Sequence, residues 1–375
     1  MNETVKKQND FCGITAWHEA GFTGKSIKVW NMEGESGHGK SSRRRVLDAA
    51  PDAQVTNASV NLECKGDQIL KESITIGNMT YTHDGFIATH GFSILTQSIG
   101  GDGLRETGKT YLYGGLRRKY NLTLFNSAGN DGSDGVKGGA LPESESIYVG
   151  ACMMFKNNPE DLRMWNYSSI GKEFEQVDFS TFTGGLNGTS FSAPYLAGMA
   201  ALLQGRYGKD MTSAEVYQYF KMCARYIDTG HPKNMSYDLW SGYGVPILPP
   251  PSVKYIRMTI GDKFYKVDGK TETMDTAPFI KDSRTFVPVA FVALALGAQV
   301  EWSALEKKVT IYRDNSTLSM WIGSNTYVLN GKPYTMDTAP FIKDSRTFVP
   351  IAFIAEALGC KVSWIESERK VMVLG

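Results

Sequence analysis

Residues 187–203 read Asn-Gly-Thr-Ser-Phe-Ser-Ala-Pro-Tyr-Leu-Ala-Gly-Met-Ala-Ala-Leu-Leu, and this segment is the strongest indication of the fold in the sequence. A glycine turn leads to Ser190, and the apolar segment that follows is typical of a buried helix. A serine at such a junction exposes its hydroxyl near the positive end of the helix dipole, which suits a nucleophile. Taken alone, the stretch is equally typical of a serine that caps a buried helix.

Strand-like runs alternate with longer segments over the first 245 residues. These runs are short, and they occupy residues 27–32, 92–97, 122–126 and 147–149. The intervals between them are long enough to hold helices. This alternation predicts an α/β fold whose mainly parallel sheet has helices on both faces. Glycine clusters follow the ends of these strands, where open α/β sheets place their ligands.

The motif around Ser190 resembles the nucleophile motif of the subtilisin-like serine peptidases (subtilases), and two upstream segments extend the resemblance. Residues 127–132, Ser-Ala-Gly-Asn-Asp-Gly, are similar to the family's oxyanion-hole segment, which implies that the Asn130 side chain donates a hydrogen bond to an oxyanion. An ordinary Asn-Asp-Gly turn has the same sequence. Residues 96–101 resemble the strand that pairs with the substrate backbone. The resemblance therefore implies a substrate-binding set of Ser98, Ile99, Gly100, Gly101 and Gly129.

The catalytic base must be one of five histidines. His38 precedes residues 46–55, whose Ala-Pro-Asp-Ala sequence resembles the stretch after the family's histidine helix. His90 is the alternative. It lies directly before residues 92–101, where the family has a turn between a helix and the substrate-binding strand. We therefore expect His38 to be the base.

The acid follows from an ungapped match of residues 23–33 to the first strand of the subtilase core. That strand ends at an aspartate in the family, and Glu33 occupies the position here. The resemblance implies that Glu33 orients His38 and stabilises its imidazolium. A register with Asn31 at this position would be damaging, because an amide can hold the wrong imidazole tautomer and lower turnover about 10⁴-fold.

Three features depart from the family pattern. The expected acid and base are only five residues apart, so the loop between them is nearly absent. Residues 40–45 are polar where the family has a buried helix, so this helix is either partly exposed or its arginines pair with acids such as Glu35 and Asp48. The three arginines are more typical of a solvated face than of a binding site. The segment after His38 is also too short for the calcium-binding loop of many family members, so we expect no calcium there.

The C-terminal part of the chain contains a tandem duplication. The run Met-Asp-Thr-Ala-Pro-Phe-Ile-Lys-Asp-Ser-Arg-Thr-Phe-Val-Pro occurs at residues 274–288 and again, 62 residues later, at 336–350. The repeats resemble the copper amine oxidase N-terminal-like, or stalk, repeats of Gram-positive surface proteins. Residues 251–375 contain no histidine and one cysteine, so no ordinary copper site can be built from them. The identical blocks are either a shared folding core or a binding surface.

Each repeat predicts short strands and one helix, at residues 289–296 and 351–358, which makes the tail a small α+β tandem-repeat domain. Asp268-Gly269 and Asn330-Gly331 are hairpin turn signals, and residues 308–312 and 370–374 are typical of closing strands. The proline-rich sequence before the repeats is typical of a linker. The expected division of the chain is a peptidase-like domain at residues 1–247, a linker at 248–253, and repeats at 254–315 and 316–375.

The composition argues against several functional classes. A formal net charge of +1 over 375 residues argues against a nucleic-acid-coating protein. No apolar run reaches the roughly 18–20 residues of a membrane helix. Five scattered cysteines without a CxxC pair indicate neither a zinc site nor a disulfide framework, and we expect no metal and no cofactor. No secretory signal is visible, although the resemblance favours an extracellular, cell-surface or virion-associated location.

The resemblance implies a serine endopeptidase that acts on a protein or peptide substrate with Ser190 as its nucleophile. Two alternatives stay open. The glutamate in place of aspartate and the shortened loop are also consistent with a pseudopeptidase that binds extended peptides without cutting them. The tail indicates a third function, a surface or virion structural protein with a processing module, whose repeats bind a cell-wall or surface partner.

Overall fold

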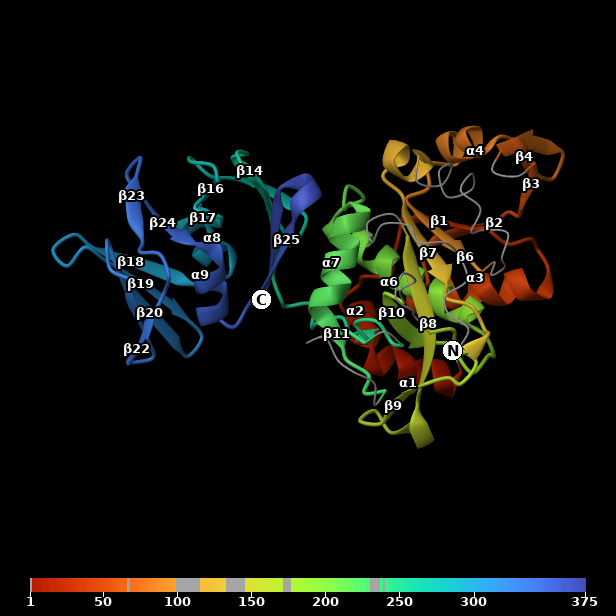
Figure 1. The fold of residues 1–375 in the computed structure, drawn as a ribbon, viewed down its shortest axis with the longest axis horizontal. Coiled ribbons are helices and arrows are strands. Elements are labelled where there is room, and N and C mark those ends of the chain that lie inside the picture. The colour runs from red at the N-terminus through yellow and green to blue at the C-terminus, as the bar shows by residue number, and fades with distance from the viewer. Residues whose placement is uncertain are drawn as a thin grey trace. The chain divides into compact units, whose positions relative to one another are not determined.

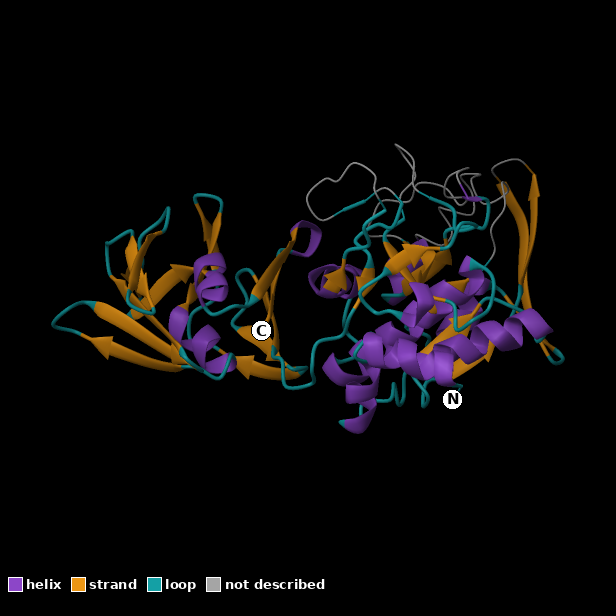
Figure 2. Cartoon of the chain, turned by 90° about the horizontal axis from the view of Figure 1, so that it is seen from below, coloured by secondary structure: helices purple, strands orange, loops and turns teal. Residues whose placement is uncertain are grey.

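The computed structural model describes residues 2–65, 68–98, 115–132, 146–170, 177–229, 237–238 and 240–375. The chain forms two compact units, Met1–Pro250 and Pro251–Gly375. Each is described by itself below (Figure 1). Figure 2 shows that the N-terminal unit combines helices with a sheet, whereas the C-terminal unit consists mostly of strands.

A parallel sheet forms the centre of the N-terminal unit. Its strands are β1 (Lys28–Asn31), β2 (Gln54–Asn57), β6 (Ile94–Gln97), β7 (Thr123–Ser127), β8 (Ile147–Met154) and β10 (Phe179–Phe182). They lie in the order β10-β8-β7-β6-β1-β2, and each neighbouring pair is parallel. The short strand β9 (Leu162–Met164) pairs antiparallel with β8. The predicted mainly parallel sheet is confirmed.

Helices cover both faces of this sheet, as the sequence predicted. On one face, α6 (Ser192–Tyr207) packs against the sheet and lies beside α3 (Gly37–Ala49). The two helices come close because residue 198 is glycine: a Cβ there would lie 2.4 Å from the main-chain oxygen of Val46. On the other face, Phe86 of α4 (His83–His90) packs against Trp30, with ring centroids 4.9 Å apart.

Smaller elements complete the N-terminal unit. Its other helices are α1 (Glu3–Phe11), α2 (Ile14–Glu19), η3 (Phe155–Asn157), η4 (Thr189–Phe191) and α7 (Ser213–Cys223). A capping box between Thr212 and Glu215 begins α7. Two further strands, β11 (Ala224–Arg225) and β12 (Val245–Pro246), pair with each other. An antiparallel sheet of β3 (Val60–Lys65), β4 (Gln68–Ile76) and β5 (Met79–Tyr81) was not predicted.

The C-terminal unit is built from three antiparallel sheets and two short helices. The helices are α8 (Val289–Ala295) and α9 (Ile351–Ala357), as predicted, and η5 (Glu366–Glu368) is a single turn. The first repeat supplies β13 (Tyr255–Thr259), β14 (Phe264–Val267), β15 (Lys270–Thr273), β16 (Phe279–Lys281), β17 (Arg284–Pro288), β18 (Gln299–Ser303) and β19 (Lys308–Arg313). The second supplies β20 (Ser316–Trp321), β21 (Thr326–Leu329), β22 (Lys332–Thr335), β23 (Phe341–Lys343), β24 (Arg346–Pro350), β25 (Lys361–Ile365) and β26 (Lys370–Leu374).

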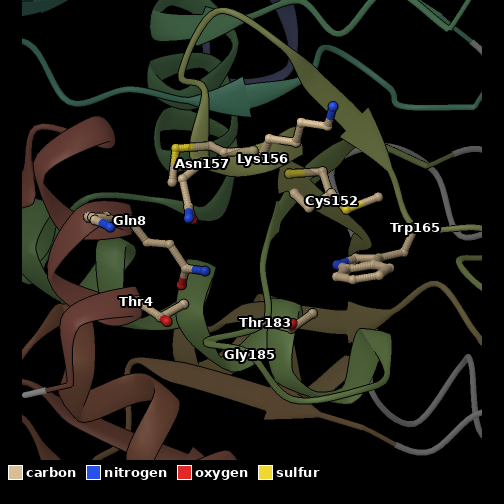
Figure 3. A pocket seen from close by; sticks show the side chains of 11 residues that line it. Thr4, Gln8, Cys152, Lys156, Asn157, Trp165, Thr183 and Gly185 are labelled. Atoms are coloured by element: carbon tan, nitrogen blue, oxygen red, sulfur yellow. The ribbon is translucent and has the colours of Figure 1, made fainter.

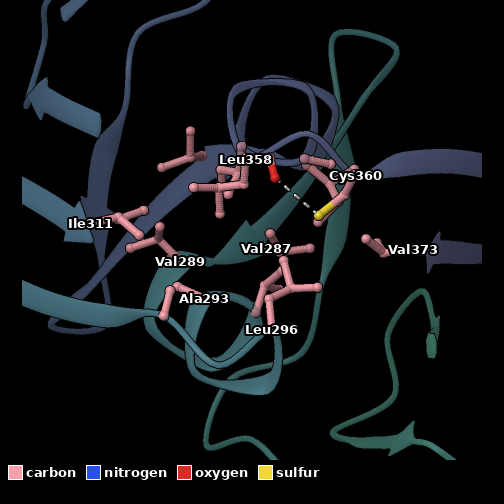
Figure 4. Close-up of a cluster of buried hydrophobic side chains, with 14 of the residues drawn as sticks. Val287, Val289, Ala293, Leu296, Ile311, Leu358, Cys360 and Val373 are labelled. Atoms are coloured by element: carbon pink, nitrogen blue, oxygen red, sulfur yellow. Dashed lines mark hydrogen bonds between the residues drawn. The ribbon is translucent and has the colours of Figure 1, made fainter. Parts of the chain in front are cut away.

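Both repeats contribute to every sheet. The orders are β15-β14-β13-β26-β25, β16-β17-β24-β23 and β18-β19-β20-β21-β22, so β19 pairs with β20 across the predicted repeat limit at residue 315. One hydrophobic core, in which Val287 and Ile311 meet Leu358 and Val373, serves both repeats (Figure 4). The limits given for the two repeats in the sequence stay a prediction. In the structure, the two copies share their sheets and one hydrophobic core.

Candidate active site

Ser190 lies in the turn η4, at the start of the buried helix α6. The start of α6 is tied to β10, because the Thr181 hydroxyl donates to the main-chain oxygen of Ser192 over 2.9 Å. The Ser190 side chain is largely buried, and its Oγ donates to the main-chain oxygen of Ser98 over 3.4 Å. The Ser98 hydroxyl in turn donates to the main-chain oxygen of Ser190 over 3.0 Å. The predicted nucleophile and the first residue of the predicted substrate-binding strand are therefore neighbours.

The predicted oxyanion segment also lies against this turn. Asn130 is exposed, and its Oδ1 accepts a hydrogen bond of 2.8 Å from the main-chain N–H of Thr189. Thr189 Oγ1 additionally donates to the main-chain oxygen of Gly129 and accepts from its N–H, both over 3.1 Å. Since the Oδ1 atom is held in this way, the amide group is oriented, and its Nδ2 remains able to donate.

A glycine keeps the space beside this amide open. Gly188 has a φ of +120°, which disfavours any other residue. A Cβ at this position would lie 3.6 Å from both the Nδ2 and the Oδ1 of Asn130. Thr189 was not among the predicted site residues, although it belongs to the quoted motif. Its side chain joins the nucleophile turn to the oxyanion segment.

The expected acid and base lie next to each other. Glu33 follows β1, and His38 is in the first turn of α3, where Ser36 caps the helix by accepting from the N–H of Gly39 over 3.2 Å. Oε2 of Glu33 is 3.4 Å from Nδ1 of His38. The Glu33 side chain is 15% exposed and that of His38 is 43% exposed, so solvent reaches the imidazole more readily than the carboxylate.

His38 reaches the nucleophile turn through its neighbour Phe191. The imidazole and the Phe191 ring are tilted against each other with centroids 5.1 Å apart. Within the described part of the chain, no hydrogen bond links His38 to Ser190, whose Oγ is bonded to Ser98 instead. Catalytic hydrogen bonds are often long or misaligned before substrate binds, so this arrangement is compatible with a base that acts on Ser190.

His90, the alternative base, lies in a different environment. Its Nδ1 is 2.9 Å from the main-chain oxygen of Phe86, and its ring is stacked on Phe92 with centroids 5.4 Å apart. Tyr81 packs on the edge of the same imidazole. These contacts place His90 in the aromatic cluster around α4, on the sheet face opposite α3 and α6.

Asn31, which would take the position of the acid in the damaging register, does not face the histidine ring. Its buried amide donates to the main-chain oxygen of Gly39 over 3.2 Å and to Oδ1 of Asn57 over 2.9 Å. The Oδ1 of Asn31 accepts a hydrogen bond of 2.9 Å from Ser42. The side chain near the imidazole is therefore that of Glu33.

The polar segment after His38 forms a partly buried helix whose arginines pair with Asp48. Arg45 is 1% exposed, which contradicts the expected solvated face for this residue. Its guanidinium donates to Asp48 over 2.7 Å and to the main-chain oxygen of Phe182 over 3.0 Å, and it lies 4.3 Å from the centroid of the Tyr195 ring. Arg44 also pairs with Asp48, from an exposed position. Sequence could not show this burial, because it depends on the contacts with α1, α6 and β10.

A separate pocket of about 310 Å³ lies between α1 and the ends of β8 and β10. Gln8 and Thr4 of α1 line one side, and Cys152 and Trp165 line another (Figure 3). It includes none of the predicted site residues. Burial raises the pKa of the Cys152 thiol well above its ordinary value, so this cysteine is an inert part of the wall.

Several expectations fall outside the described residues. Ile99, Gly100 and Gly101 of the predicted substrate-binding set belong to this group. Among the residues that the structure describes, no cluster of three or more metal-ligating side chains occurs. No helix in the same part of the chain is long and apolar enough to cross a membrane.

Comparison with known proteins adds two family matches. The family model of the subtilases matches residues 31–244, more than half of the chain, and the copper amine oxidase N-terminal domain matches residues 253–305 and 266–373. Subtilisin DY of Bacillus licheniformis is 28% identical over 218 residues, which cover 52% of this chain and 74% of that protein.

Solved structures of proteases are also similar to this chain. MycP1 from the ESX-1 type VII secretion system is 16% identical, with a TM-score of 0.45 over 64% of this chain and 84% of its own. The S41 psychrophilic protease is 16% identical, with a TM-score of 0.46 over 60% of this chain and 93% of its own.

Proposed function

The chain belongs to the subtilase family and is a serine endopeptidase, and we propose that it cleaves peptide bonds with Ser190, His38 and Glu33 as its catalytic triad. The observation that carries this assignment is the 3.4 Å contact between Glu33 and His38. The His38 imidazole also packs against Phe191, the residue next to Ser190. The substrate is a protein or a peptide.

In the proposed mechanism, Ser190 Oγ attacks the carbonyl carbon of the scissile bond while its proton passes to Nε2 of His38. The tetrahedral intermediate collapses as His38 gives this proton to the leaving amine, and the acyl group stays on Ser190. Water then attacks the ester with His38 again as the base, which releases the acid and restores the serine. Each step is a proton transfer or an acyl transfer, so no redox partner is needed.

Glu33 takes the part that aspartate has in the family. Its carboxylate would accept a hydrogen bond from the Nδ1–H of His38, hold the reactive tautomer and stabilise the imidazolium. The present distance of 3.4 Å exceeds the roughly 2.7–2.9 Å of a charge-assisted hydrogen bond, so we propose that substrate binding shortens it.

Asn130 and the main-chain N–H of Ser190 would bind the developing oxyanion. The contact from Thr189 to Oδ1 supports this role, because it leaves the donor side of the Asn130 amide available. Loss of one such donor typically lowers turnover by about 10²–10³-fold. We therefore expect Asn130→Ala to reduce kcat in that range with little change in KM.

The substrate would lie extended along Ser98 and the residues that follow it. Ser98 is the site residue in contact with Ser190, and an extended peptide can add to such a segment through main-chain hydrogen bonds. Gly129 is bonded to the nucleophile turn through Thr189, and we propose that it borders the same groove.

A pseudopeptidase is the second candidate, and one observation favours it: the Ser190 hydroxyl is bonded to Ser98 rather than to His38. Labelling with a fluorophosphonate probe, together with cleavage of a protein substrate, separates the two hypotheses. The triad predicts labelling of the wild type, no labelling of Ser190→Ala and strongly reduced labelling of His38→Ala. His90→Ala is the matched control and should retain labelling. A folded wild type that is neither labelled nor active would contradict the triad.

We further propose that the C-terminal repeats bind a cell-wall or surface partner, as their resemblance to the stalk repeats of Gram-positive surface proteins implies. The full-length Ser190→Ala variant, which cannot digest the partner, would be mixed with purified cell envelopes and sedimented. Binding that disappears when the chain is cut after residue 250 supports the proposal. Equal sedimentation of both proteins would contradict it.

A further inference from the structure

The end of β1 carries a buried amide directly after two buried apolar residues. Asn31 is 0% exposed and follows Val29 and Trp30, which are equally buried. A buried amide is tolerated when its donors and acceptor are bonded, and the hydrogen bonds to Gly39, Asn57 and Ser42 meet this condition. An apolar residue would fill the same space without requiring any partner. The amide therefore has a specific task at this position.

Two of the partners of Asn31 lie on α3, the helix that carries His38. Asn31 donates to the main-chain oxygen of Gly39 over 3.2 Å, while the N–H of Gly39 donates to the cap residue Ser36. The main-chain oxygen and the N–H of Gly39, the residue after His38, are thus both hydrogen-bonded to side chains. One turn further along, Ser42 donates to Asn31 over 2.9 Å. The first two turns of α3 are thus fixed to the end of β1 at two points.

Asn31 is also joined to the turn that carries Glu33. Its main-chain oxygen accepts a hydrogen bond of 2.7 Å from the N–H of Glu33 and another of 3.1 Å from the N–H of Ala58. In addition, a Cβ at residue 39 would lie 3.1 Å from the Cβ of Glu33 and 1.9 Å from the main-chain oxygen of Gly34, so α3 packs closely against the turn of the acid. One residue thus contacts the segment of the acid and the helix of the base.

We propose that Asn31 is a positioning residue that sets the separation of Glu33 and His38. Only four residues lie between the acid and the base, so no long loop can adjust the distance between their side chains. The amide of Asn31, at the end of β1, fixes this distance instead. This inference rests on the proposed triad. It adds that the Asn31 side chain acts on turnover through Gly39 without touching substrate.

The test compares Asn31→Leu, which has a similar shape and no hydrogen bonds, with wild type. We expect kcat to fall about 10²-fold, as misplacement of a catalytic group by about 1 Å does, while KM changes less than twofold. Ser42→Ala removes only the bond to Oδ1 and should give a smaller loss of the same kind. Ser180→Ala is the matched control, because it removes a buried hydrogen bond of 3.1 Å to Ser241 at the far edge of the sheet.

A second readout does not depend on activity. The imidazole resonances of His38, followed by NMR, should shift in Asn31→Leu and Ser42→Ala and stay unchanged in Ser180→Ala. Folded Asn31→Leu with wild-type kcat and wild-type His38 resonances would overturn the positioning role while leaving the triad intact. An inactive wild type would overturn the triad, and the resonances would still report whether Asn31 holds His38. If Asn31→Leu does not fold, unchanged kcat and resonances in Ser42→Ala overturn the inference.

Discussion

Replacement of Gly39 by alanine tests the contact between the acid turn and the base helix. A Cβ at residue 39 would lie 1.9 Å from the main-chain oxygen of Gly34, whereas ordinary contact begins near 3.4 Å. The two segments must therefore separate by about 1.5 Å, the difference between these distances. The gap between Glu33 and His38 is already 3.4 Å, so the variant should lose this contact.

The expected effect on Gly39→Ala is large for catalysis and moderate for stability. Misplacement by more than about 1 Å predicts a loss in kcat of about 10²-fold or more. Overpacking should cost about 1–3 kcal/mol, which lowers Tm by about 2–4 °C per kcal/mol in a domain of this size. Helix propensity alone predicts the opposite, since alanine is favoured over glycine by about 1 kcal/mol.

The assay is steady-state cleavage of a peptide at 25 °C, with thermal unfolding monitored by circular dichroism. Gly37→Ala is the matched control in the same helical turn, because a Cβ at residue 37 meets nothing within 4 Å. It should keep wild-type kcat and Tm. Wild-type kcat in folded Gly39→Ala would refute the idea that contact between these segments sets the geometry of Glu33 and His38.

Three further predictions concern stability and reactivity. Arg45→Met removes a buried guanidinium and leaves the Asp48 carboxylate poorly compensated, so the free energy of unfolding in urea should fall by about 3–5 kcal/mol. The exposed Arg44→Met should lower it by less than about 1 kcal/mol, and equal losses would contradict the burial of Arg45. The Arg346 guanidinium lowers the pKa of Asp275 below its ordinary value of 3.8, so this pair stabilises the C-terminal unit above that pH and less as the pH falls below it. Hydrogen exchange of β24 should lose this pH dependence in Asp275→Asn, and an unchanged profile would count against the pair. Burial raises the pKa of the Cys12 thiol to about 12, so this thiol should resist iodoacetamide at pH 8 until the protein unfolds, and rapid alkylation of native protein would show that it is accessible.

The elements that sequence predicted best are those governed by local spacing. The turns at Asp268-Gly269 and Asn330-Gly331 have positive φ at both residues, and each joins two antiparallel strands as expected. The strand predicted at residues 370–374 is β26. In each case the backbone preference of a few neighbouring residues suffices, so no distant contact was needed.

The antiparallel sheet of β3, β4 and β5 was missed although β3 and β5 alternate apolar and polar residues; β4 does not keep this alternation along its length. The interleaving of the two repeats was also missed. Their identical sequence blocks suggest two separate copies, yet β17 pairs with β24 and the exposed ion pairs of Arg284 with Asp337 and Arg346 with Asp275 cross from one block to the other. Sequence identity does not say which copy a strand joins.

For the candidate site, the sequence identified residue types and order, and the tertiary structure determined distances and environments. Asn31, a polar residue directly after Val29 and Trp30, was a visible signal, but its partners come from α3 and β2 and could not be named in advance.

The sequence by itself determined the parallel α/β class, the buried helix after Ser190 and the family, because each follows from local periodicity or a contiguous motif. Only the tertiary structure decided that Arg45 is buried and that Glu33 lies 3.4 Å from His38. These features depend on which distant segments meet, and a periodic pattern shows which face of an element is buried without showing what covers it.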